Sequence, residues 1–125
     1  MRHNVAGHKL GRTSGARTAL RRNLIRQLFI HERIRTTEAK ASAVRADAER
    51  IITIARNSAN GSDAEKVAAR RLVISKLGSN EIIKRVFDEI GPRFANRNGG
   101  YTRVVKLGPR LGDSAEMVIL ELIEE

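Results

Sequence analysis

The chain has no cysteine and no tryptophan, and it has only two prolines and four aromatic residues among 125. The absence of cysteine excludes disulfides and thiolate zinc sites, and it is typical of a reducing compartment. No apolar run approaches the ~20 residues of a membrane-spanning helix. Four aromatic side chains are too few for a sheet that stacks RNA bases, and no RNA-recognition-motif sequence is present. The sequence therefore favours a reducing compartment, such as the cytoplasm, and no membrane contact.

Acidic residues are missing from the start of the chain, where the first is Glu32. Residues 1–35 carry nine lysines and arginines against this one acid, whereas residues 113–125 carry five acids and no base. The net charge of the whole chain is +10. For a small domain, such a charge indicates an anionic partner, usually a nucleic acid. The acidic end suggests a basic protein neighbour or simple solubility.

Hydrophobic periodicity predicts four helices, over about 14–31, 37–57, 62–78 and 80–91. A short strand around Ile34 follows the first helix, and two strands are expected over 101–107 and 115–123. The order α-β-α-α-α-β-β predicts a two-layer α+β fold, with helices packed on a small three-stranded sheet. We expect a single domain over residues 13–125, preceded by the basic arm, defined here as residues 1–12.

The apolar residues of each helix predict which side faces the core. The first helix is expected to bury Ala16, Leu20, Leu24, Ile25, Leu28 and Phe29. The second is expected to bury Val44, Ala48, Ile51, Ile52 and Ala55. The third is expected to bury Ala64, Val67, Ala68 and Leu72, and the fourth Ile82, Ile83, Val86, Phe87 and Ile90. Gly91 and Pro92 are expected to end the fourth helix.

Catalytic and metal-binding motifs are weak in this chain. GHKLGRT at 7–13 resembles a phosphate-binding loop, but its spacing is one residue short and Arg12 replaces the lysine. HERIR at 31–35 starts like a zinc-protease helix, but Arg35 stands where the second histidine is required. We expect no metal, no cofactor, no small-molecule substrate and no catalysis. An enzyme that uses the glycine-rich opening remains an alternative, which ATP binding through Gly7–Thr13 would support.

Three further interpretations of the basic residues remain. An arginine-rich opening without acids is also typical of transit peptides, although its helix continues with the periodicity of a core helix. A DNA-binding regulator would concentrate its bases on one recognition helix, and here they are spread over an arm, a helix, a loop and a strand. A folding adaptor would bind a partner protein at high salt. Spread cations suit a folded RNA that is held by shape and phosphate.

A second basic patch surrounds the predicted loop after the fourth helix. On an extended strand Tyr101 and Arg103 share one face, so that ring and guanidinium would project together. Two interpretations are open: the pair stacks on a nucleotide, or the tyrosine lies half in the core beside a solvated arginine.

Long motifs give the chain a family resemblance over nearly all of its length. MRH, GHKLGRT, TALRRNL, HERIRTT, KRVFDEIGPRF, NRNGGYTRVVKLGPRLGDSAEM and the closing ELI occur in this order. In these motifs the chain resembles the bacterial large-subunit ribosomal protein seventeen family. The resemblance implies a structural protein of the large subunit, near the polypeptide exit tunnel, bound to 23S rRNA and neighbouring ribosomal proteins and not a homo-oligomer.

The resemblance, together with the two basic patches, also gives the residues expected to contact rRNA. They are Arg2, His3, Lys9, Leu10, Arg12, Thr13, Arg17, Arg21, Arg22, Asn23, Arg26, Arg33, Arg35, Thr36, Thr37, Arg93, Arg97, Asn98, Gly99, Gly100, Tyr101, Arg103, Lys106 and Arg110.

Overall fold

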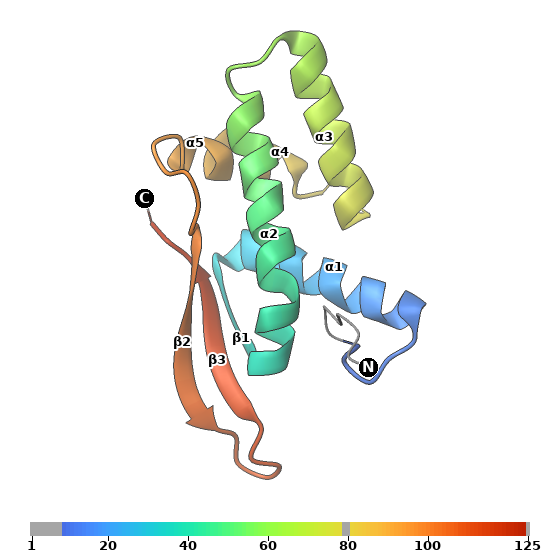
Figure 1. Cartoon of the computed structure of the whole chain (residues 1–125), viewed down its shortest axis with the longest axis vertical. Helices are drawn as coiled ribbons and strands as arrows, with labels where there is room; N and C mark the ends of the chain where they lie inside the picture. The colour runs from blue at the N-terminus through green and yellow to red at the C-terminus, as the bar shows by residue number, and fades with distance from the viewer. Residues whose placement is uncertain (1–8, 79–80, 125) are drawn as a thin grey trace, which may run out of the picture.

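A computed structural model of the chain describes residues 9–78 and 81–124. Its helices are α1 (Ser14–His31), α2 (Glu38–Ser58) and α3 (Asp63–Leu77), followed by a helical segment made of α4 (Ile83–Arg85), a π-helical turn (Val86–Ile90) and α5 (Gly91–Arg93). The strands are β1 (Arg33–Thr37), β2 (Thr102–Pro109) and β3 (Glu116–Leu122). The helices lie on one side of the sheet (Figure 1), so the predicted two-layer α+β fold and its element order are confirmed.

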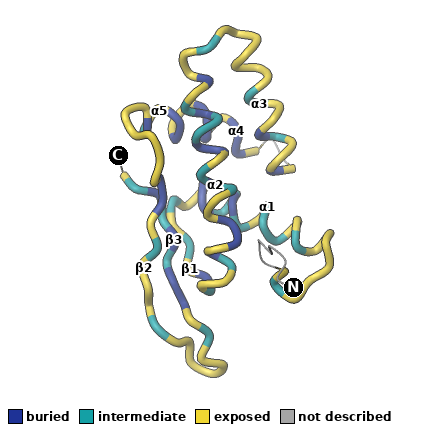
Figure 2. Tube along the Cα trace, in the orientation of Figure 1, coloured by how far each residue is buried: buried dark blue, intermediate teal, exposed yellow. Residues whose placement is uncertain are grey.

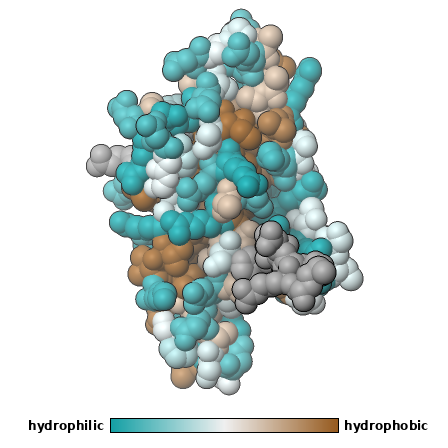
Figure 3. Space-filling view, viewed as in Figure 1, coloured by the Kyte–Doolittle hydropathy of each residue, from teal (hydrophilic) through white to brown (hydrophobic). Residues whose placement is uncertain are grey.

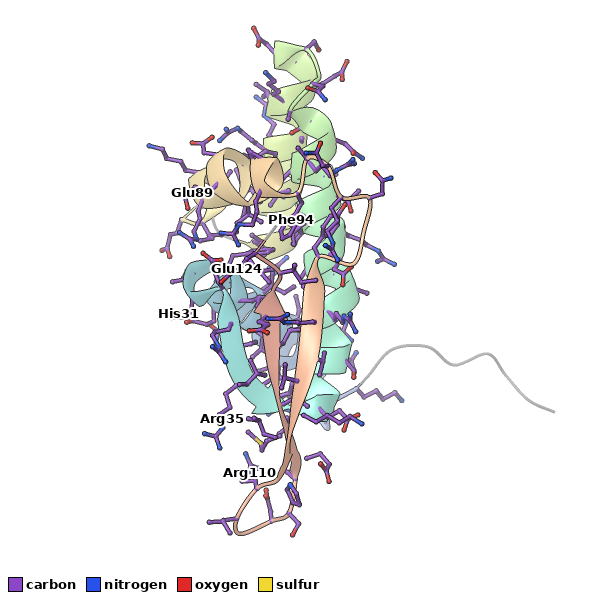
Figure 4. The ribbon with its side chains drawn as sticks, turned by 90° about the vertical axis from the view of Figure 1, so that its left-hand side faces the viewer. His31, Arg35, Glu89, Phe94, Arg110 and Glu124 are labelled. Atoms are coloured by element: carbon purple, nitrogen blue, oxygen red, sulfur yellow. The ribbon has the colours of Figure 1, made fainter. Side chains whose placement is uncertain are left out.

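The sheet is antiparallel with strand order β1-β3-β2, so the last strand lies between the other two. Its inner face carries Val118, Leu120 and Leu122, which are all buried against the helices. The other face is uncovered (Figure 4). The β2–β3 hairpin extends past the end of β1 (Figure 1), and Leu111 at its tip is 98% exposed. A β-bulge between Lys106 and Gly108 interrupts the pairing of the hairpin.

Polar side chains set where the three long helices start. Thr13, Thr37 and Ser62 each accept a hydrogen bond from a backbone N–H in the first turn of the helix that follows. Such caps satisfy amide groups that have no partner within the helix. The predicted starts of α1, α2 and α3 are therefore confirmed. The predicted start of the fourth helix at Asn80 lies outside the described residues.

The core forms where the helices meet the sheet, shown by the dark segments in Figure 2. The predicted inner faces of α2 and of the fourth helical segment are confirmed, since every residue named for them is buried. On α1 the prediction holds only for the second half. Ile25, Leu28 and Phe29 are buried, whereas Leu24 is half-buried and Ala16 is exposed.

The predicted inner face of α3 is wrong. Val67 and Leu72 are each 47% exposed, and Ala64 and Ala68 are also exposed. The helix instead buries Val73 and Leu77, which lie in its last turns. Only this end of α3 packs firmly into the core. The side of the helix that faces inward there is different from the one that the apolar spacing indicated.

The predicted helix end at Gly91 and Pro92 is also wrong, because one further turn runs to Arg93. Gly91 lies against α2, where an added Cβ would come within 3.1 Å of the Ala55 Cβ and 3.2 Å of the Ala55 carbonyl carbon. Pro92 occupies the first turn of α5, where a missing N–H costs little. Glycine is therefore needed here for close approach of two helices, and not to stop one.

Candidate nucleic-acid interface

The start of α1 presents a group of three cations. Lys9 and Arg12 are exposed and Arg17 is partly exposed. Among residues 9–78 and 81–124, no carboxylate lies within ion-pair distance of these three side chains. The first turn of α1 has no acidic residue, so the positive end of the helix dipole adds to their field. This surface attracts anions strongly.

A tight turn fixes the chain just before α1. Leu10 and Gly11 both have positive φ angles, of 57° and 64°. The Arg12 Nη1 donates to the Leu10 carbonyl at 2.6 Å, and the Arg17 Nη1 donates to the Arg12 carbonyl at 3.4 Å. Both guanidinium groups therefore help to hold the turn, while Arg12 is exposed and Arg17 is partly exposed. Thr13, also predicted as a contact, is the cap of α1, and Asn23 is exposed. The predicted contacts Arg2 and His3 lie outside the described residues.

The second half of α1 uses its arginines differently. Arg22 donates to the Ser75 and Lys76 carbonyls at 3.1 and 3.2 Å, and Arg26 donates to the Leu77 carbonyl at 2.8 Å. These are carbonyls at the end of α3 that have no partner within the helix. Both residues were predicted as RNA contacts, and the structure gives them a capping role that the sequence did not reveal.

The predicted contact Arg93 is engaged at a junction of α1, the fourth helical segment and the sheet. Glu32 is the residue after α1, and its carboxylate oxygens accept hydrogen bonds from the Arg93 Nη1 at 2.5 Å and the Arg85 Nη2 at 2.7 Å. The Arg93 hydrogen bond lowers the pKa of Glu32 against an opposing effect of desolvation, and the two positive charges lower it further. The same bond raises the pKa of Arg93. This cluster stabilises the fold and leaves little of Arg93 for phosphate.

The loop after α5 is held from inside by Arg56, which the sequence analysis did not select. Its guanidinium donates to the Phe94 and Ala95 carbonyls at 3.0 and 3.2 Å and to the Asn98 side chain at 2.9 Å. The predicted contacts in this loop are exposed, and they are Arg97, Asn98, Gly99 and Gly100. Arg97 donates to the Gly99 and Gly100 carbonyls, at 3.2 and 3.1 Å, which keeps the loop compact.

Tyr101 belongs to the core, which favours the second of the two interpretations, although its ring is fully buried and not half-buried. The residue is 1% exposed, and its ring packs on Phe94 at 5.0 Å between centroids. Thr53 donates to its hydroxyl at 3.4 Å. It precedes β2, which begins at Thr102, so it does not share the open face of that strand with Arg103. A buried tyrosine whose hydroxyl finds a partner is the expected arrangement for a core residue.

The open face of the sheet carries the second basic surface. Residues paired across antiparallel strands share a face, and here Arg33, Glu121 and Arg103 form one row. Both arginines pair with Glu121, so this acid is compensated within the chain. Arg35 projects from β1 and Arg110 lies at the far end of the hairpin (Figure 4). Asp113 pairs with Arg110 at 2.5 Å, and this contact holds the pKa of Asp113 below its usual range.

The remaining predicted contacts on the strands divide into exposed and structural residues. Lys106 is exposed, whereas Thr36 is only 8% exposed and lies on the inner face. Thr37 accepts from the Lys40 amide and caps α2. Two groups of exposed cations thus lie on opposite sides of the molecule, one at the start of α1 and one on the sheet and hairpin (Figure 1).

Hydrophilic side chains cover most of the face shown in Figure 3, with smaller apolar areas between them. Within the described residues, no group of three His, Cys, Asp or Glu side chains could hold a metal ion. None of the helices in that part of the chain combines the length and the hydropathy needed to cross a membrane.

Comparison with known proteins identifies the family of the chain. The family profile described as ribosomal protein L17 matches residues 20–123. The chain belongs to the ribosomal protein L17 family. It is 52% identical over 123 residues to the large ribosomal subunit protein bL17 of Nitratidesulfovibrio vulgaris, which covers 97% of this chain and 86% of that protein.

Two further members of the L17 family align over similar lengths. The large ribosomal subunit protein bL17 of Desulfitobacterium hafniense is 46% identical over 119 residues, which are 95% of this chain and all of that protein. The bL17 protein of Syntrophotalea carbinolica is 42% identical over 125 residues, which are the whole of this chain and 76% of that protein. The resemblance inferred from the sequence motifs is thus confirmed.

Proposed function

We propose that this member of the L17 family is a structural component of the large ribosomal subunit that binds 23S rRNA. The observation that carries the proposal is the uncompensated positive charge of Lys9, Arg12 and Arg17 at the start of α1. The names of its relatives, as large-subunit proteins, point to the same assembly. No catalytic step is part of this function.

The mechanism is neutralisation of phosphate charge by a rigid surface. Arginine forks bind phosphate oxygens in pairs, and neutral backbone groups near a helix start add further donors. The turn at Leu10 and Gly11 fixes the backbone between Lys9 and Arg12, next to the start of α1. Cations on the sheet and hairpin lie away from this point, so one protein would link two RNA segments that otherwise repel each other.

The position in the subunit is a further part of the proposal. The family resemblance implies a location near the polypeptide exit tunnel, with the basic arm inserted in rRNA and other ribosomal proteins alongside. Two of the acids at the chain end, Asp113 and Glu121, are paired with arginines of the same chain. The structure of the acidic end therefore supports a basic protein neighbour less strongly than its composition alone does. Cross-linking of the chain in assembled subunits would test this placement.

Binding to RNA is tested by a salt series with the full chain. Fragments of 23S rRNA and random duplex DNA are titrated between about 50 and 200 mM salt, where 6–10 phosphate contacts lower affinity by roughly 10³–10⁵. We expect one rRNA fragment to keep its preference over DNA at the higher salt. Arg12→Gln should weaken that binding, and Arg71→Gln, which removes an exposed arginine from α3, serves as the charge-matched control.

Different results would point to a different function. Equal affinity for all polyanions would contradict a specific rRNA site. A preference for one duplex DNA sequence would support a DNA-binding regulator, and ATP binding that is lost on changing Gly7–Thr13 would support an enzyme. Capture of a protein partner at high salt without RNA would support a folding adaptor.

A further inference from the structure

A groove separates the second turn of α1 from the middle of α2 and the end of α3. It has a volume of about 230 Å³. Pockets for drug-sized ligands usually have ~300–1,000 Å³, so this groove suits a smaller group, such as a single nucleotide base. None of its residues on α2 or α3 was selected from the sequence as a contact, because the cations on those helices alternate with acids.

The floor of the groove is apolar and its walls are charged. Ile25 and Ile51, which are 4% and 1% exposed, form part of the floor. Arg21, Arg50 and Lys76 provide positive charge around it. An aliphatic floor below guanidinium groups can receive the flat face of a base and the phosphate attached to it.

One carboxylate stands among these cations. The Asp47 Oδ2 is 3.9 Å from the Arg21 Nη1, and its Oδ1 is 3.6 Å from the Arg50 Nη1. Both distances exceed a hydrogen bond. Within residues 9–78 and 81–124, no group donates a hydrogen bond to either oxygen of Asp47. The carboxylate is therefore held by two long ion pairs, and its oxygens can still accept hydrogen bonds from a ligand.

The chemistry of the bases decides which one fits. A carboxylate accepts hydrogen bonds through both oxygens and donates none. Guanine presents two neighbouring donors, N1–H and N2–H, on its Watson–Crick edge. Adenine, cytosine and uracil each place at least one acceptor beside their donor, which would face the negative charge.

We propose that this groove holds one unstacked guanine nucleotide of the bound RNA, with Asp47 accepting hydrogen bonds from its Watson–Crick edge. The base lies against Ile25 and Ile51, and its phosphate faces the cations at the rim. The inference rests on the proposed rRNA binding and adds a base-specific contact to it.

The effect of one substitution on RNA affinity distinguishes a guanine contact from general charge attraction, because the two predict changes of opposite sign. Asp47→Asn removes a negative charge, so charge alone predicts equal or tighter RNA binding. Loss of the guanine contact predicts weaker binding, by about tenfold, which is typical of a bidentate base contact. Asp88→Asn is the matched control, because Asp88 is another partly exposed carboxylate paired with an arginine, outside this groove. It should bind as tightly as the wild type or more tightly.

The experiment measures fluorescence anisotropy of the full-length protein with the 23S rRNA fragment that the wild type prefers. Circular dichroism checks that each variant is folded. A second measurement needs no variant: the fragment is transcribed with sparse inosine in place of guanosine, which removes the 2-amino group, and bound RNA is separated from free. We expect inosine at one unpaired guanosine to be depleted from the bound RNA.

The outcomes distinguish this inference from the function on which it rests. Specific binding by the wild type, with Asp47→Asn as tight as Asp88→Asn and no inosine depletion, overturns the groove and leaves rRNA binding intact. Failure of the wild type to prefer any rRNA fragment overturns both. Weaker binding of folded Asp47→Asn, with depletion at one guanosine, supports the site. If Asp47→Asn is unfolded, the inosine result alone decides.

Discussion

The two halves of α1 use the same kind of residue for different purposes. Arg17, in the first half, lies beside solvent with no carboxylate near it among the described residues, whereas Arg26, nine residues later, is bonded to the end of α3. The second half also buries Ile25, Leu28 and Phe29. A single helix thus anchors the core at one end and presents charge at the other. Arginine content alone does not separate binding residues from structural ones.

The largest effect should come from the core of the second half. Leu28 is fully buried, so Leu28→Ala should lower the free energy of unfolding by about 2–5 kcal/mol. Leu24→Ala, at a half-buried neighbour, is the control and should cost clearly less. Urea denaturation followed by circular dichroism measures both. Equal costs would mean that the inner side of α1 is placed wrongly.

The next effect should come from the arginine that caps α3. Arg26→Ala leaves the Leu77 carbonyl without its partner and should lower the free energy of unfolding by about 1–3 kcal/mol. The affinity for rRNA, measured where the variant is fully folded, should change much less than for Arg12→Gln. A large affinity loss with unchanged stability would assign Arg26 to the binding surface instead.

A smaller and pH-dependent effect is expected where α1 ends, at Glu32. The pKa of this carboxyl is lowered in the folded state, chiefly by Arg93. Its contribution to stability is therefore present above the unfolded pKa of about 4.3, and it is lost as the pH falls through the folded value. The difference in unfolding free energy between wild type and Glu32→Gln should shrink as the pH is lowered from about 6 to about 3. A constant difference over that range would contradict the ion-pair cluster.

The smallest effect on stability is expected in the first half of α1. Arg17→Gln should change the free energy of unfolding by less than about 0.5 kcal/mol, as for most surface positions. It should nevertheless weaken rRNA binding and reduce the salt slope by about one phosphate contact. Measured stability loss comparable to that of Arg26→Ala would remove the distinction between the two halves of the helix.

The sequence predicted the element order and most of the core because those depend on local patterns. The inner side of α2 and the approximate starts of the three long helices follow from spacing and residue type. The inner side of α3 could not be predicted in this way, because two faces of the helix have similar apolar content. Which face turns inward depends on how the end of α3 packs against α1. That docking involves Arg22 and Arg26, more than 50 residues away in the chain.

The candidate site was predicted less completely, for a similar reason. Charge density identified the start of α1. The Tyr101 ring, however, is buried and cannot contact a ligand, and Arg22, Arg26 and Arg93 are bonded to distant parts of the same chain. The groove near Asp47 brings together three helices, so no short motif contains it.

The bulge in the β2–β3 hairpin has a consequence for the free protein. β2 is an outer strand of the sheet, and an unbroken outer strand offers a template on which another chain can add and start aggregation. Here the register shift between Lys106 and Gly108, followed by Pro109 without an N–H, interrupts that template. The opposite outer strand, β1, is only five residues long. Both outer strands therefore give a second chain only a short or interrupted edge on which to pair.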